Sequence, residues 1–234
     1  ANEMKNLHTF SIDYEDNRKY FHKTDFTVSE DNDFIKLMSD LNQTHHHYCV
    51  ISNQDLADSL ADSVHFRDMP GMADVDSSLY WFCKKIKEGF TVSLSGECAD
   101  EIFGGYPWYR DKKIRAINGF PWSQSIIYRK SFIKDDIKIP NSEEYSLTRY
   151  KDTIINTSKI DGISPLESRM KEMMKLNIDW FMQTLLDRKD RMSMASGVEV
   201  RVPFADHRII EYVFNVPWEM KYRNGVEKAL LRDA

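Results

Sequence analysis

Three short apolar segments in the first third of the chain constrain its fold most strongly. His8–Ile12, His46–Ser52 and Phe90–Leu94 have the length and side-chain pattern of strands. Between the second and third of them lie two amphipathic helical patterns, over residues 56–64 and 79–86. Strands that alternate with helices form parallel sheets whose faces the helices cover. We therefore predict an α/β fold with one parallel sheet of three strands, a small sheet that lacks one edge.

The second half of the chain shows helical rather than strand patterns. Ser164–Glu167 is a capping box with proline at the first helical position, and the apolar spacing behind it predicts a helix to about Leu186. We interpret the methionines of that helix as core packing. Asp206 caps a further helix. The chain thus divides into a parallel α/β part, residues 1–110, and a mainly helical part, residues 111–234.

Composition and charge argue against several classes of partner. With 32 Lys+Arg against 37 Asp+Glu, the 234 residues carry a net charge of −5, which does not favour nucleic acid or anionic membranes. The longest nearly apolar stretch, Ile209–Trp218, is far shorter than the roughly 18–20 residues of a membrane span. Cys49, Cys83 and Cys98 are sparse and odd in number, as in a cytoplasmic protein with reduced thiols. The first residues carry no apolar signal segment. Because the chain starts at Ala1 and not at an initiating Met, we expect it to be part of a longer gene product.

A group of carboxylates follows the third predicted strand directly. Ser95 and Gly96 form a small-residue turn, and Glu97, Asp100 and Glu101 come within the next five residues. In an open α/β sheet, ligands bind at the carboxyl ends of strands, and glycine lets a ligand approach the backbone. Clustered carboxylates repel one another, and Mg²⁺, which takes one or two carboxylates with phosphate oxygens and water, relieves that repulsion. From spacing alone, acids that cap the start of a helix are an equally good interpretation.

A basic cluster lies at the end of the long predicted helix and just beyond it. Arg188, Arg191 and Arg201 stand among acids there, and guanidinium groups suit phosphate and carboxylate ligands. By itself, the cluster favours an ion-pair network that joins the helical half to the sheet. His45–His47 do not predict a metal site, because neighbouring strand residues point to opposite faces and no other Cys or His spacing completes a zinc site.

Four segments together resemble the synthetase domain of the glutamine-dependent, B-type asparagine synthetase family. Residues 95–106, SGECADEIFGGY, are similar to the family's SGEGxDExFGGY, and residues 190–208 resemble its DRxSMAxxxExRxPFLDHR. His8–Ile12 resembles the family's HSFxV strand, and Glu227–Arg232 matches a later KxLLR element. A long double motif of this kind is specific. The resemblance therefore overrides the helix-cap and ion-pair interpretations of the two clusters.

The resemblance implies an ATP-pyrophosphatase fold of the adenine nucleotide alpha hydrolase-like type, with helices on both faces of the sheet, and a ligase that uses ATP and Mg²⁺. It implies that aspartate is adenylated to β-aspartyl-AMP with release of pyrophosphate, and that ammonia then displaces AMP to give asparagine. By resemblance, Asp100 binds Mg²⁺, Glu97 is the catalytic base beside the activated carboxylate, and Ser95, Gly96 and the Ile12 backbone hold adenosine. The weaker candidates, whose individual roles the resemblance does not assign, are Glu101, Arg188, Arg191 and Arg201.

The sequence also departs from the family pattern. The pyrophosphate-binding SGGxDS loop, the glutaminase domain and the segment with the family's pyrophosphate-side lysine do not occur in these residues, and Cys98 replaces a glycine. We therefore expect a partial synthetase domain that does not make asparagine alone, from a parent chain with a glutaminase domain. A missing central strand exposes a sheet edge, so we expect self-association, such as a homodimer, or a rearranged N-terminus.

Two other functions remain open from the sequence. Beta-lactam synthetases and peptide-modifying cyclases resemble the same motifs and use a different acceptor, although Glu97 favours asparagine synthesis. A non-catalytic nucleotide-binding module predicts ATP binding that does not depend on Asp100. Under the leading interpretation, the partners are the small molecules aspartate, ATP and ammonia.

Overall fold

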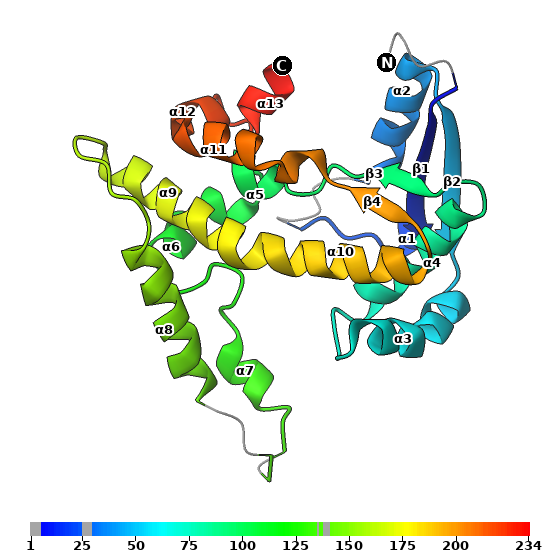
Figure 1. Ribbon diagram of the computed structural model, residues 1–234, viewed down its shortest axis with the longest axis horizontal. Helices are drawn as coiled ribbons and strands as arrows, with labels where there is room; N and C mark the ends of the chain where they lie inside the picture. Colours follow the sequence, from blue (N-terminus) through cyan, green and yellow to red (C-terminus); the bar gives the residue numbers. More distant parts are fainter. Residues whose placement is uncertain (1–5, 25–29, 135, 138–140) are drawn as a thin grey trace. The chain divides into compact units, whose positions relative to one another are not determined.

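The chain forms two compact units in a computed structural model that describes residues 6–24, 30–134, 136–137 and 141–234 (Figure 1). Residues 1–5, considered above for a leader, lie outside the described residues. The first unit comprises Ala1–Ser95 and Leu185–Arg201, and the second comprises Gly96–Thr184 and Val202–Ala234.

Two parallel strands open the first unit, as the sequence predicted. β1 (His8–Tyr14) pairs with β2 (His45–Ile51), and Ile12 lies opposite Cys49 in the register. Both strands match their predicted ranges to within two residues. The connection between them contains α1 (Asn17–Tyr20) and α2 (Asn32–Asn42), which were not predicted.

The three consecutive histidines of β2 make contacts that alternate along the strand. The ring of His46 hydrogen-bonds the hydroxyl of Ser11 at 2.9 Å, while the ring of His47 hydrogen-bonds the ring of His8 at 2.7 Å. Among the residues that the structure describes, no group of three His, Cys, Asp or Glu side chains is placed to hold a metal ion.

β3 (Val92–Leu94) does not join that sheet, so the prediction of one three-stranded sheet is wrong. It pairs in parallel with β4 (Glu199–Arg201), which gives a second two-stranded sheet (Figure 1). Backbone hydrogen bonds extend the pairing on both sides: the N–H of Glu199 donates to the carbonyl oxygen of Thr91 at 2.8 Å, and that of Ser95 donates to the carbonyl oxygen of Arg201 at 2.9 Å. The sequence does not reveal β4 because three residues are too short to show a period of two, and the partner strand lies far away in the sequence.

The helices α3 (Asn53–Arg67) and α4 (Asp74–Lys87) pack against each other in the first unit. α3 does not bury the predicted apolar stripe, since Leu60 is 42% exposed, and Ser59 and Ser63 are buried in its place. Small side chains on this face let the two helix backbones approach closely. The buried apolar cluster of the unit comprises Leu79, Tyr80, Cys83 and Met192, and Leu79 and Cys83 belong to the helical pattern predicted over residues 79–86.

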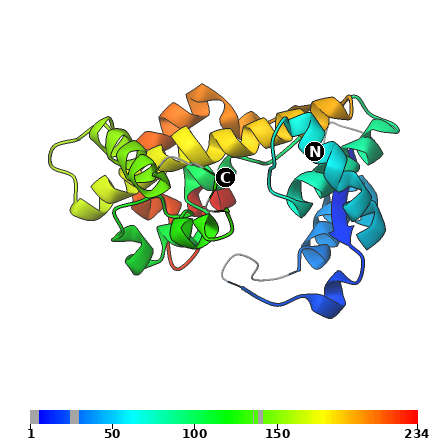
Figure 2. The same ribbon diagram turned by 90° about the horizontal axis from the view of Figure 1, so that it is seen from below.

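The second unit is helical (Figure 1). Its elements are α5 (Ala99–Phe103), η1 (Pro107–Tyr109), α6 (Lys112–Arg115), α7 (Ile126–Lys130), α8 (Ser142–Ile155), α9 (Pro165–Leu176), the π-helical turn η2 (Asn177–Met182), η3 (Pro203–Ala205), α11 (His207–Asn215), α12 (Trp218–Lys221) and α13 (Ala229–Asp233). α11 lies along α9 in both views (Figures 1 and 2), and Lys171 Nζ donates to the carbonyl oxygen of Phe214 at 2.9 Å. In the part of the chain that is described, no helix is long and apolar enough to cross a membrane.

The long predicted helix runs further than expected. Helical residues continue from Pro165 through η2 and α10 (Gln183–Ala195), nine residues beyond the predicted end at Leu186. Met170, Met173 and Met174 are each 2% exposed or less, which confirms that the methionines are core packing.

The two N-caps predicted from the sequence, Ser164 and Asp206, are present, and Ser52 caps α3 in the same way. The side chains of three residues accept hydrogen bonds from backbone N–H groups of the first turn, namely Ser52 in α3, Ser164 in α9 and Asp206 in α11. Glu167 does not close the capping box back onto Ser164. Its carboxylate instead accepts from the backbone N–H of Trp218 at 2.9 Å, which ties α12 to α9.

Candidate functional site

The chain passes from the first unit to the second between Ser95 and Gly96, directly after β3. The backbone bond from Ser95 to Arg201 joins the two sequence motifs within the first unit. A Cβ atom at Gly96 would meet no protein atom within 4 Å. Protein packing therefore does not require glycine there, and the missing side chain leaves room for a ligand against the backbone.

Cys98, the residue that differs from the family pattern, lies in the turn after Gly96. It adopts a left-handed conformation with φ of 74° and is 2% exposed. Burial, and after it the charges of Glu101 and Glu97, raises the pKa of the Cys98 thiol to about 12. The thiol therefore stays protonated at neutral pH and is not a nucleophile. The substitution adds buried volume to the turn rather than chemistry.

Asp100 presents a partly exposed carboxylate that already binds a cation. Its Oδ1 atom lies 2.8 Å from Lys228 Nζ, and the two side chains are 38% and 24% exposed. Gly105 lies directly beneath this pair: a Cβ there would be 1.7 Å from Asp100 Oδ1 and 3.0 Å from Lys228 Cδ. Only glycine lets the carboxylate and the lysine stem lie over the backbone at this point.

Glu101 lies inside the core rather than at the surface. It is 1% exposed, and the hydroxyl of Tyr106 donates to its Oε1 atom at 2.7 Å. The hydroxyl of Tyr109 donates to the Glu101 carbonyl oxygen at 3.0 Å. Burial raises the pKa of Glu101, the Tyr106 hydrogen bond opposes this, and the charges of Asp100 and Glu97 add to the rise. The three carboxyl groups thus share one electrostatic environment, in which Glu101 holds the turn in shape.

The KxLLR element brings Lys228 to this turn. Leu230 and Leu231, on α13, pack against the buried cluster that contains Ile102 and Phe103 of α5. Arg232 donates to the carboxylate of Glu227 at 2.7 Å, and this ion pair lies at the start of the same segment. Lys228 was part of a matched motif, but the sequence alone gave it no role, because its partner Asp100 lies far away in the sequence.

Arg188 belongs to a buried ion-pair network of the first unit. Asp76 is 1% exposed and accepts hydrogen bonds from Arg67 Nη1 at 3.0 Å and from the N–H of Met72 at 2.9 Å. Its other oxygen lies 3.8 Å from Arg188 Nε. Sequence reasoning missed Arg67 and Asp76, because no motif marks them and the three charged side chains come from three separate helices.

The other two candidate arginines also form ion pairs in the first unit. Arg191 donates to Asp187 and Asp68, each at 2.9 Å. Arg201 is exposed and donates to Glu199 at 2.8 Å. Ion pairing is therefore what the structure shows for these arginines, and a contribution to phosphate or substrate binding stays a prediction.

Ile12 is half-buried in β1, and the next residue closes a polar cavity. Asp13 accepts hydrogen bonds from the hydroxyl of Tyr48 at 2.6 Å and from the side-chain amide of Asn32 at 2.9 Å. Burial raises the pKa of Asp13, but these and other hydrogen bonds outweigh it, so that the pKa is lowered. All three side chains line a cavity of about 430 Å³ at the carboxyl end of β1. No sequence signal pointed to it, because its residues come from separate elements.

The donor set of the acidic turn fits a Mg²⁺ ion that arrives with a nucleotide. Mg²⁺ is usually bound by one or two carboxylates and completed by phosphate oxygens and water. Asp100 offers one accessible carboxylate that already attracts a positive charge. Within the described residues, no third carboxylate or histidine is placed to form an all-protein cage. The structure thus brings Glu97, Asp100 and Glu101 together in the second unit, and Ser95 with Arg201 in the first.

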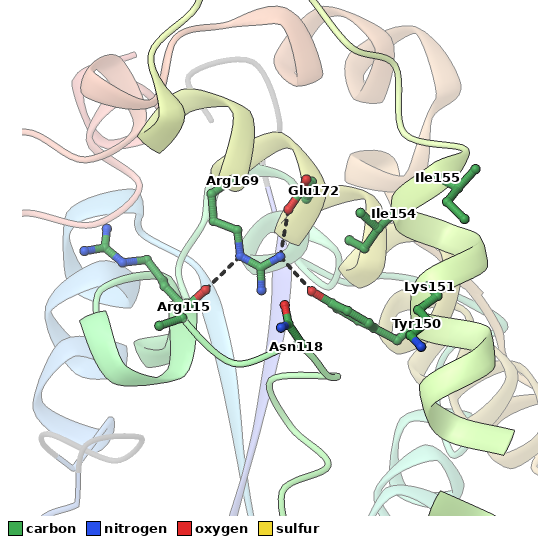
Figure 3. Close-up of a pocket in the computed structure, with 9 residues that line it drawn as sticks. Arg115, Asn118, Tyr150, Lys151, Ile154, Ile155, Arg169 and Glu172 are labelled. Atoms are coloured by element: carbon green, nitrogen blue, oxygen red, sulfur yellow. Dashed lines mark hydrogen bonds and ion pairs between the residues drawn. The ribbon is translucent and has the colours of Figure 1, made fainter. Parts of the chain in front are cut away.

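A separate cavity of about 520 Å³ lies beside α8 and α9 in the second unit (Figure 3). Arg169 crosses it and donates to the carbonyl oxygen of Arg115 at 2.8 Å, to Tyr150 Oη at 3.0 Å and to Glu172 at 2.7 Å. A further bond joins it to the carbonyl oxygen of Ile117 at 3.0 Å. The guanidinium group is thus used to hold a loop and two helices together, and this cavity is a structural junction.

Short parallel strands among helices, a glycine turn at a strand end and carboxylates on the helix that follows define an α/β protein, and the family match places it in the ATP-pyrophosphatase type. Comparison with known proteins gives the family. The family described as asparagine synthase matches residues 1–234, and this chain belongs to it.

Curated relatives agree with the family. The chain is 51% identical over 229 residues to Asparagine synthetase (glutamine-hydrolyzing) 3 of Bacillus subtilis (strain 168), which covers 97% of this chain and 37% of that protein. It is 27% identical over 215 residues to Asparagine synthetase (glutamine-hydrolyzing) 1 of the same strain, covering 79% of this chain and 34% of the relative. A stretch of 47 residues, 20% of this chain, is 51% identical to 8% of the asparagine synthetase of Homo sapiens. The chain thus spans about a third of the length of the two bacterial relatives. The beta-lactam synthetase and binding-module alternatives are not favoured by these matches.

Proposed function

We propose that this chain carries the amide-forming half of a glutamine-hydrolysing asparagine synthetase. The observation that carries the proposal is the match over 97% of the chain to a relative with that name. The accessible carboxylate of Asp100 and the open backbone at Gly96 support it, because adenylation needs a polyphosphate and an adenosine to lie at this strand end.

In the proposed first step, a side-chain carboxylate oxygen of aspartate attacks the α-phosphorus of ATP. The bond to the β-phosphate breaks, pyrophosphate leaves with the electron pair, and β-aspartyl-AMP remains. Ser95, Gly96 and the Ile12 backbone hold adenosine, and Asp100 holds the Mg²⁺. When bound, Mg²⁺ neutralises charge on the departing pyrophosphate.

In the proposed second step, the nitrogen of ammonia attacks the activated carbonyl carbon, and the bond to AMP breaks. The attacking nitrogen must lose one proton, and Glu97 accepts it as general base. Glu101 acts indirectly, since it keeps Tyr106 and the turn in place. Phosphate or substrate groups can bind the three candidate arginines only if they replace the carboxylates that pair with these side chains now, and the arginines concerned are Arg188, Arg191 and Arg201.

The remaining partners follow from the same proposal. Ammonia comes from glutamine, hydrolysed by a glutaminase domain in the same polypeptide. The free cysteines Cys49, Cys83 and Cys98 fit a cytoplasmic location. A second copy pairing along an open strand edge gives the proposed homodimer, and light scattering of the purified chain measures it.

A chimera tests the proposed activity. These 234 residues replace the matching segment of the B. subtilis relative, and asparagine and pyrophosphate are measured with ATP, aspartate and glutamine. We expect both products in equal amounts, and a loss of about 100-fold or more in Asp100→Asn. Glu97→Gln should slow asparagine formation more than pyrophosphate release. Glu88→Gln, which removes an exposed acid paired with Lys85, is the matched control and should change neither.

Circular dichroism shows whether the exchanged segment is folded, and glutamine hydrolysis shows that the glutaminase domain of the chimera is intact. A chimera that hydrolyses glutamine yet forms no asparagine from aspartate contradicts the proposed function. Pyrophosphate release that requires a different carboxylic acid would instead indicate another acceptor for the same adenylation.

A further inference from the structure

The ion pair between Lys228 and Asp100 places an ammonium group on the proposed metal ligand. The contact is 2.8 Å long and involves Oδ1 of the carboxylate. We propose that Lys228 is a positioning residue that competes with the divalent cation for Asp100 and, once displaced, binds the polyphosphate that the cation carries. This inference rests on the proposed function, which assigns the cation to Asp100 but gives Lys228 no role.

The fold fixes the position of Lys228 in three ways. Lys228 precedes α13 in a left-handed conformation with φ of 52°, which a lysine adopts rarely. Behind it, Leu230 and Leu231 anchor α13 on the cluster beneath α5. In front, the lysine stem passes so close to Gly105 that a Cβ there would lie 3.0 Å from Lys228 Cδ. These constraints therefore hold the ammonium group at the turn and restrict the lysine side chain to few rotamers.

The charges around the turn explain why a cation is needed in both states. Glu97, Asp100 and the buried Glu101 place three carboxyl groups within five residues. Without a nucleotide, the ammonium of Lys228 offsets part of this negative charge. A divalent cation on Asp100 binds the same carboxylate and supplies more positive charge, so the two compete. After the exchange, the ammonium lies one contact away from the metal ligand, within reach of phosphate oxygens bound to the same ion.

Mn²⁺ alone is the first probe, with free Mn²⁺ measured by electron paramagnetic resonance on the 234-residue chain. Lys228→Met removes the competitor, so we expect the Kd for Mn²⁺ to fall about three-fold, the size of effect of one partly exposed ion pair. Lys228→Arg keeps the charge and should stay within about two-fold of the unchanged chain. In the Asp100→Asn background, Lys228→Met should have no effect, because the shared ligand is gone. Lys85→Met, which breaks an exposed lysine ion pair with Glu88, is the matched control.

The second probe is adenosine 5′-(α,β-methylene)triphosphate with Mn²⁺, which binds but cannot be cleaved between the α and β positions. Lys228→Met should weaken its binding about ten-fold, and Lys228→Arg should restore most of it. If Lys228→Met raises the affinity for Mn²⁺ but lowers the affinity for the nucleotide analogue, Lys228 moves from Asp100 to phosphate. A purely structural role of Lys228 would change both affinities in the same direction. Circular dichroism checks folding first, and Lys228→Gln replaces Lys228→Met if the latter does not fold.

Each negative result identifies what is wrong. If Asp100→Asn abolishes Mn²⁺ binding but neither Lys228→Met nor Lys228→Gln tightens it, the competition is refuted while the proposed metal site stands. If Lys228→Met tightens Mn²⁺ without weakening the nucleotide analogue, the transfer to phosphate is refuted. If Mn²⁺ binds equally well to Asp100→Asn, the metal assignment in the proposed function fails and this inference fails with it.

Discussion

Replacing Lys221 with methionine tests whether a buried ammonium group lowers the stability of this fold at neutral pH. Lys221 is 2% exposed, and its Nζ atom lies 3.7 Å from the sulfur of Met174. Burial, and then the charge of Lys171, lowers the pKa of Lys221 to about 7, with Glu167 opposing the shift. Methionine has a similar length and no charge, so the substitution removes the ammonium and keeps most of the packing.

The magnitude follows from the difference between the folded and unfolded pKa values. The pKa falls from 10.5 to about 7, and each unit corresponds to about 1.4 kcal/mol, so the charged lysine lowers the free energy of unfolding by about 5 kcal/mol at low pH. Between pH 7 and 10.5 the unfolded chain binds this proton and the folded chain does not, so stability rises with pH. Below pH 7 both states hold the proton, and the full cost is present and constant.

Urea unfolding of both proteins at a series of pH values measures this effect. The gap in free energy of unfolding between wild type and Lys221→Met should shrink by about 3 kcal/mol between pH 7 and 9.5. All other titrating groups are common to the two proteins, so their contributions cancel when the two free energies are subtracted. Lys175→Met, which breaks an ion pair with Asp179 on the same helical segment, is the control and should change stability by less than about 1 kcal/mol. Parallel pH curves for wild type and Lys221→Met would refute the reasoning.

Two further predictions concern other parts of the chain. Gly96→Ala should leave the urea midpoint unchanged, because the added Cβ meets no protein atom, yet it should weaken binding of the nucleotide analogue about ten-fold. Gly89→Ala, where the added Cβ is equally unhindered, is the control and should change neither quantity. Equal nucleotide affinity in the two variants would show that Gly96 is not part of the site. Asp76→Ala should lower the free energy of unfolding by about 3–5 kcal/mol, since it leaves buried Arg67 and Arg188 without their shared carboxylate, and a loss below about 1 kcal/mol in urea unfolding would show that the network is not a stabilising one.

Features that depend on neighbouring residues could be predicted from the sequence. β1, β2, the caps and the buried methionines follow from local periodicity and local hydrogen bonds. The acidic turn was also predictable, because a strand end, a glycine and three carboxylates lie within one short segment. Features that join distant segments could not be predicted. β4 has three residues and no period of its own, so the pairing of β3 was assigned to the wrong sheet.

The same distinction applies within the candidate site. Asp100 is marked by its motif, whereas the lysine that contacts it comes from the last helical segment and acquires meaning only through the fold. Arg188 was noticed, but Asp76, which holds it, was not, because nothing in α4 marks that aspartate among its other polar residues. In α3 the apolar spacing was misleading, since two serines allow a closer approach to α4 than leucines do.

The dependence of α5 on α13 has a consequence for how the protein is made. A ribosome synthesises the acidic turn more than 120 residues before Lys228, Leu230 and Leu231, which support it. While those residues are made, the nascent polypeptide carries an anionic loop that lacks this support. Affinity for the nucleotide, which the proposal assigns to Asp100 and Lys228 together, should therefore arise only once Leu230 and Leu231 dock beside α5.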